Sequence, residues 1–133
     1  MGKNNQTIVR NCRAERYKNF MKNDLLELFL LLQDSKNSYD EYLKNENSFH
    51  YTKKIRLTNG KILSLISNNF FFTSVDLDKL ISELKEHLID WITLWDKETL
   101  RLKPKESDKF IFSGYKQYPK DLDKVIKQYL SID

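Results

Sequence analysis

The sequence predicts a mainly α-helical protein, a compact bundle of four to five helices with one or two short extended segments. Apolar residues recur at helical spacing over several long stretches of the chain. Only three glycines and two prolines occur in 133 residues, too few for a turn-dense all-β fold. Hydrophobic residues make up 40% of the chain and charged residues 32%, so one helical domain can bury a core beneath a charged surface.

The N-terminal part of the chain divides into an arm and a first helix. Residues 1–12 are polar and show no periodicity, so we expect a flexible basic arm, followed by a single helical domain over residues 13–133. From about Arg13 the apolar residues follow helical spacing. Residues 25–32 are apolar except for Glu27 and must be buried, either in the core of this domain or against an obligate partner.

The middle of the chain allows two interpretations. The polar residues 34–37 are expected to end the first helix and to cap a second one that carries Tyr39 and Tyr42. Residues 49–66 form either a β-hairpin that turns at Asn59-Gly60 or helical structure in which Asn59 caps a short helix. The spacing of the apolar residues after Gly60 favours the helix, and the α+β hairpin is the alternative.

The last third of the chain contains two further helices. Ser74 is expected to cap a helix that runs to about Lys97 or Leu100, after a short apolar linker that contains Phe70, Phe71 and Phe72. Residues 110–112 are expected to be extended. Pro119 is expected to occupy the first position of a final helix.

One polar group stands beside an apolar helical stripe. Glu83, His87 and Asp90 follow one edge of the helix expected from Ser74, a spacing that could orient an imidazole or ligate a metal. No second segment rich in His or Cys completes a metal site, and a half-buried structural histidine that bonds a backbone carbonyl or Glu83 is the simpler interpretation. The loops of phosphate-binding and serine-hydrolase motifs are absent. We therefore expect no enzymatic activity, no metal and no cofactor.

Large apolar residues point to a protein partner or to self-association. The chain holds eight Phe, seven Tyr and two Trp, more than a small bundle needs for its core, so some of them are expected at an interface. The interface candidates are Phe70, Phe71, Phe72, Trp95, Phe110, Phe112 and Tyr115.

Charge is distributed unevenly and offers an alternative function. Residues 1–24 carry six basic and two acidic side chains, and residues 76–96 carry six acidic and two basic ones, which favours docking between opposite charges. Aromatic and basic residues also alternate in the segment 49–61, a pattern typical of proteins that stack single-stranded nucleic acid. The nucleic-acid candidates are Tyr51, Lys53, Lys54, Arg56 and Lys61.

A loose pattern covers about half of the chain. It includes Ile62-x2-Leu65-Ile66-x2-Asn69, His87-x3-Trp91, and Phe110-x-Phe112 before Tyr118-Pro119. In this pattern the chain is similar to small helical accessory proteins of bacterial defence and mobile-element loci. The resemblance implies an accessory or inhibitory role in a defence, phage or mobile-element system and assigns no residue a function. The lone Cys12, the lack of a signal-like apolar segment and the lack of a membrane span predict a cytoplasmic protein.

Overall fold

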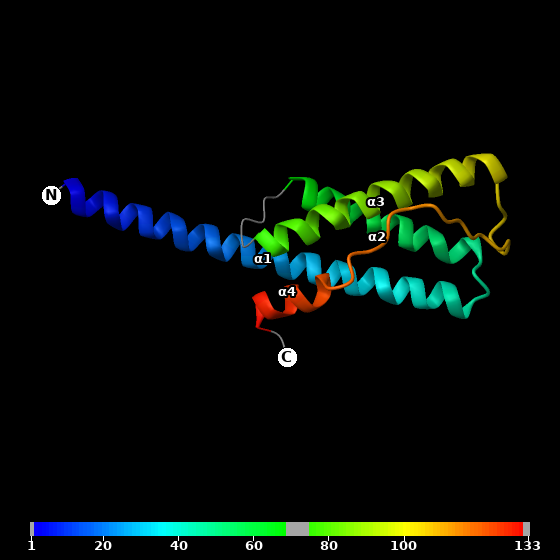
Figure 1. The fold of residues 1–133 in the computed structure, drawn as a ribbon, viewed down its shortest axis with the longest axis horizontal. Coiled ribbons are helices and arrows are strands. Elements are labelled where there is room, and N and C mark those ends of the chain that lie inside the picture. The colour runs from blue at the N-terminus through cyan, green and yellow to red at the C-terminus, as the bar shows by residue number, and fades with distance from the viewer. Residues whose placement is uncertain (1, 69–74, 132–133) are drawn as a thin grey trace.

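In the part of the chain that the structure describes, four helices form a bundle, within the predicted four to five. The structure, a computed structural model, describes the backbone of residues 2–68 and 75–131 and the side chains of residues 23–68 and 75–131. The helices are α1 (Gly2–Lys44), α2 (Phe49–Asn68), α3 (Val75–Leu102) and α4 (Leu122–Leu130). In these residues the only β interaction is an isolated bridge between Ser48 and Lys109. α2 contacts both α1 and α3, and α4 also contacts both (Figure 1).

Each helix contributes an apolar stripe to the core. α3 shows the pattern most clearly, because Leu77, Leu84, Leu88 and Trp91 share one face and are all buried. The main core joins leucines and isoleucines from all four helices. A second, aromatic cluster forms around Tyr42, Ile55 and Trp91, toward the end of the bundle where α1 ends.

α1 continues through the predicted break at residues 34–37, so that prediction is wrong. The polar residues there are accommodated without ending the helix: Ser38 Oγ donates to the carbonyl of Asp34 at 2.9 Å, and Ser35 Oγ donates to Asn59 on α2 at 3.0 Å. Leu32 and Tyr42, on either side of the segment, are both buried. Packing on both sides therefore holds one continuous helix across a polar stretch.

α2 also runs through a predicted boundary. Asn59 and Gly60 lie in the interior of one helix, so neither the hairpin nor the separate short helix forms. A glycine inside a helix costs roughly 0.5–1 kcal/mol relative to alanine. The buried residues Ile55 and Ile62 flank the pair and tie α2 to the core on both sides, and this tertiary packing overrides the local turn signal.

The segment 103–121, here called the C-terminal strap, returns along the bundle from the end of α3 to α4 (Figure 1). It meets the corner between α1 and α2, where the amides of Phe49 and His50 donate to the carbonyls of Asp108 and Glu106 at 2.8 and 2.9 Å. These carbonyls satisfy the free N–H groups at the start of α2. Tyr42 Oη donates to the carbonyl of Phe110 at 2.5 Å, which anchors the expected extended residues 110–112.

The boundaries of the last two helices differ from the predicted ones. α3 continues to Leu102, and α4 begins at Leu122, three residues after Pro119. The amide of Leu122 donates to the carbonyl of Pro119 at 3.3 Å, so Pro119 belongs to the turn that leads into the helix. The predicted cap Ser74 and the linker residues Phe70, Phe71 and Phe72 lie outside the described residues.

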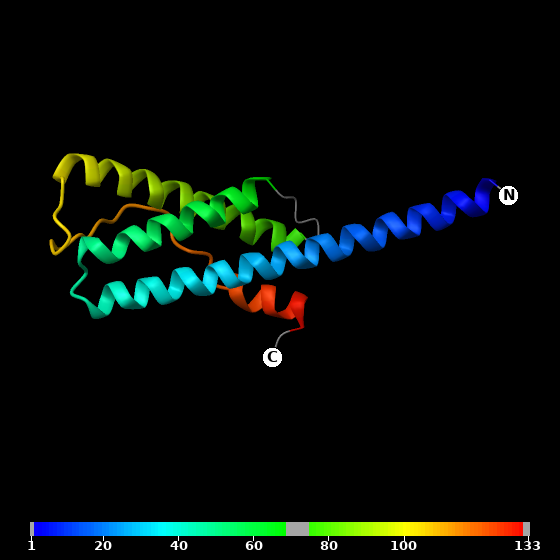
Figure 2. The ribbon, with the colours of Figure 1, turned by 180° about the vertical axis from the view of Figure 1, so that it is seen from behind.

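The first part of α1 extends beyond the rest of the bundle, as both ribbon views show (Figures 1 and 2). α1 begins at Gly2, so its backbone is helical across the predicted boundary between the arm (residues 1–12) and the domain. Whether residues 1–12 contribute to folding stays a prediction.

Candidate functional site

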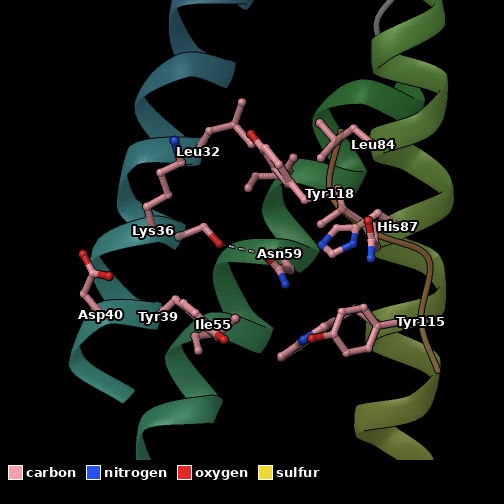
Figure 3. A pocket seen from close by; sticks show the side chains of 15 residues that line it. Leu32, Lys36, Tyr39, Asp40, Ile55, Asn59, Leu84, His87, Tyr115 and Tyr118 are labelled. Atoms are coloured by element: carbon pink, nitrogen blue, oxygen red, sulfur yellow. Dashed lines mark hydrogen bonds between the residues drawn. The ribbon is translucent and has the colours of Figure 1, made fainter. Parts of the chain in front are cut away.

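A cavity of about 530 Å³ opens between α1 and α3, with α2 as its floor (Figure 3). Its volume lies in the range of small-molecule sites, about 300–1,000 Å³. Leu32, Ile55, Ile62, Leu84 and Leu88 supply much of its apolar wall. The C-terminal strap closes one side with residues 115, 117 and 118.

His87 projects from α3 into this cavity and is half-buried. Its Nδ1 lies 2.5 Å from the carbonyl oxygen of Lys116. A carbonyl can only accept, so Nδ1 carries the proton and Nε2 of the neutral ring is an acceptor. Burial lowers the pKa of His87, opposed by the bond to Lys116 and by the charge of Asp90. The neutral ring is therefore the form that the site favours.

Asn59 faces His87 from α2 (Figure 3). Its side chain is almost fully buried, with 4% of the residue exposed. Oδ1 accepts the bond from Ser35, which leaves the amide Nδ2 without a hydrogen-bond partner among the described residues. Among the described residues, only Oγ1 of Thr99 is a fully buried side-chain atom without a hydrogen-bond partner. The unpaired Nδ2 of Asn59 is therefore not fully buried, and its accessible surface faces the cavity that Asn59 lines.

Three tyrosines line the cavity, from α1 and from the strap. Tyr118 Oη donates to Asp123 at 2.7 Å, and burial raises the pKa of Tyr118. Burial also raises the pKa of Tyr115, with a further contribution from Tyr39. The phenols of Tyr115 and Tyr118 are therefore uncharged near neutral pH. The rings of all three tyrosines add flat apolar surface.

The predicted polar group is split by the structure. His87 and Asp90 both bind Lys116 of the strap: His87 bonds its carbonyl, and Asp90 accepts from its amide at 3.1 Å. Lys116 Nζ also pairs with Glu86. Glu83 is half-buried and has no hydrogen bond to His87. This helix edge thus fastens the strap, and His87 alone of the three lines the cavity.

The predicted interface residues take different positions. Phe110 is 2% exposed and belongs to the core of this chain. Trp95 is half-buried, stacks on Phe49 and donates Nε1–H to Thr52 at 2.9 Å. Phe112 and Tyr115 are half-buried in the aromatic cluster, and residues 70–72 lie outside the described residues. Packing of the strap against α2 and α3 therefore buries, within this chain, part of the aromatic surface that was expected at an interface.

Ion pairs occupy part of the predicted nucleic-acid surface. Lys53 pairs with Glu106, and Arg56 pairs with Asp96 through bonds of 3.0 and 3.3 Å. Lys54 and Lys61 are exposed, on another face of α2, and Tyr51 is half-buried. The five residues therefore do not form one stacking surface.

Sequence reasoning missed Asn59, Ser35 and Tyr39 as cavity residues. Asn59 was interpreted as a turn or cap residue, and its neighbour Gly60 strengthened that signal. A polar residue on the apolar face of a continuous α2, between Ile55 and Ile62, is the signal that could have found it.

No described helix combines the length and apolarity needed to cross a membrane. No group of three or more metal-ligating side chains occurs in the part of the chain that the structure describes. Comparison with protein-family models, curated proteins and solved structures finds no match for this chain.

Proposed function

We propose that the protein is a non-enzymatic protein-interaction module that docks through the first part of α1, and that its partner is a second copy of the chain. One observation carries the proposal: the backbone of α1 continues beyond the other helices (Figures 1 and 2). In the sequence, its stripe of apolar residues continues at the same helical spacing. Inside the bundle this stripe consists of Leu25, Leu28 and Leu32, all buried.

The same helical register places Ala14, Tyr17 and Met21 on the continuation of this stripe. Isolated helices are marginally stable in water, because most helical stability in proteins comes from packing an apolar face. A helix that extends from a bundle with an apolar stripe therefore gains stability when another protein covers it.

Charge supports a second copy as that protein. Residues 1–24 carry six basic and two acidic side chains. Asp76 and Asp78, in the first turn of α3, are exposed and have no ion pair among the described residues. Basic and acidic surfaces on one chain are complementary between two copies, and such pairs accelerate and orient docking.

The biological setting is part of the proposal. An accessory or inhibitory role in a bacterial defence, phage or mobile-element system is supported by the resemblance in the sequence. Single-stranded nucleic acid is the alternative partner, supported by the exposed Lys54 and Lys61. The ion pairs of Lys53 and Arg56 weaken that alternative.

The molar mass of two double variants tests the proposal by light scattering. Tyr17→Asp with Met21→Asp places two charges on the stripe, and we expect a monomer where the wild type is a dimer. Asn19→Asp with Asn23→Asp makes the same charge change on the opposite face and should remain a dimer. A monomeric wild type, or equal dissociation of both variants, contradicts the proposal. A monomer whose gel mobility shifts with a single-stranded oligonucleotide favours the alternative.

A further inference from the structure

The cavity between α1 and α3 presents one donor on its floor, from α2, and one acceptor beside it on the α3 wall. The donor is the amide Nδ2 of Asn59, whose carbonyl end is held by Ser35. The acceptor is Nε2 of His87, whose other nitrogen is held by the carbonyl of Lys116. Figure 3 shows the two side chains lying toward one another from α2 and α3. One polar atom of each side chain is thus held by a hydrogen bond within the protein. The other, Nδ2 of Asn59 or Nε2 of His87, faces the cavity.

A ligand that satisfies both groups needs an acceptor for Asn59 and a donor for His87. A lactam, in which N–H and C=O are neighbours on one ring edge, supplies this pair. The match is important because a ligand that fills the cavity displaces water from Nδ2 of Asn59, and an amide that is then left unpaired is costly. A ligand without this edge leaves the buried amide unpaired.

The remaining walls favour a flat, uncharged molecule. Trp91 and the tyrosines at positions 39, 115 and 118 contribute ring surface, and aliphatic side chains cover the floor. At the mouth, Lys36 is paired with Asp123, while the exposed Asp40 has no cation partner among residues 23–68 and 75–131. An unneutralised carboxylate at the entrance disfavours a phosphate group.

We infer that this cavity binds a neutral planar heterocycle with a lactam edge, of the class to which pyrimidine and purine bases belong, as a free base or nucleoside. The site is separate from the first part of α1, so the inference goes beyond the proposed docking function. A dimer that fails to bind a heterocycle and a monomer that binds one are distinguishable results.

The test is a ligand-observed NMR titration of the full chain at pH 7.5, where His87 is neutral. The probes are uracil, hypoxanthine and guanosine, and the matched control is 1,3-dimethyluracil, which keeps the ring and loses both N–H donors. We expect at least one lactam probe to bind with a dissociation constant below about 1 mM and dimethyluracil to bind at least tenfold more weakly. Binding of none of the three probes, or equal binding of dimethyluracil, overturns the inference.

Two variants locate the binding. Asn59→Leu removes the donor, and we expect it to weaken binding by about 10-fold to 100-fold. Asn37→Leu makes the same substitution at an exposed position of α1 that does not line the cavity, and it should leave binding within about threefold. Unchanged affinity of a folded Asn59→Leu variant overturns the inference; if the variant does not fold, the uracil and dimethyluracil pair on the wild type decides.

A single-stranded oligonucleotide distinguishes the source of the lactam. A ten-residue oligouridylate should bind no more tightly per base than uracil, because the described residues at the cavity mouth offer no unpaired cation to a phosphate. Much tighter binding that weakens with salt would assign the chemistry to a nucleic-acid strand and overturn the assignment to a free base.

Discussion

At the scale of single residues, His87 connects the cavity to the C-terminal strap. It lies on α3, bonds the strap at Lys116 and faces the cavity. Its place beside an apolar stripe could be predicted, because it depends on one helix alone. The place of Asn59 on the apolar face of α2 was hidden by the turn signal of Asn59-Gly60, and its bond to Ser35 depends on how α1 and α2 pack against each other.

The lowered pKa of His87 predicts a pH-dependent stability. The folded state binds the proton less readily than the unfolded chain. The contribution of neutral His87 to the free energy of unfolding is therefore fully present above the ordinary pKa of about 6.5, and it is lost as the pH falls from there through the lowered pKa of the folded protein. His87→Gln keeps a donor for Lys116 and does not titrate. Urea unfolding at pH 7.5, 6.5 and 5.5 should show that the wild type loses more stability than this variant. Parallel losses would contradict the assignment.

Tyr42 gives a second prediction at this scale. Its hydroxyl donates to the carbonyl of Phe110 in a buried position, and burial raises the pKa of Tyr42 to about 12. Tyr42→Phe leaves that carbonyl without its donor and should cost about 1–2 kcal/mol in urea unfolding. Tyr129→Phe, at an exposed position, is the control and should change stability by less than about 0.5 kcal/mol. Equal effects would mean that the strap is not anchored at Phe110.

At the scale of elements, the sequence predicted the type of structure better than its boundaries. The stripe of α3 is long and regular, and so its helix could be predicted almost to its ends. The breaks predicted at residues 34–37 and at Asn59-Gly60 rested on local polar and turn signals. Burial of Leu32, Tyr42, Ile55 and Ile62 outweighed those signals, and such burial depends on neighbours that are distant in sequence.

The strap has its own conformational requirement at Gly114. This residue has φ of +97°, where a side chain is strained although the surrounding space is open. Gly114→Ala should therefore destabilise the protein by roughly 1–2 kcal/mol, measured by thermal and urea unfolding. Ser113→Ala, at the exposed preceding position, is the matched control. A variant as stable as the control would show that the strap can adopt another conformation.

At the scale of the whole molecule, residues 1–11 lie outside the predicted stripe, which begins at Ala14. Deleting residues 1–11 should leave the melting temperature within about 2 °C of the full chain, because no residue of the stripe is lost. Calorimetry at one protein concentration checks this. A decrease of several degrees would show that these residues contribute to the fold.

Association through the first part of α1 is the central claim, and hydrogen exchange tests it most directly. Backbone amides of residues 14–22 should exchange rapidly in dilute protein and slowly at high concentration, since an uncovered helix opens readily and a packed one does not. The amides of α2 and α3 are the internal reference and should not change. Rapid exchange of residues 14–22 at every concentration at which the protein stays folded would contradict the claim.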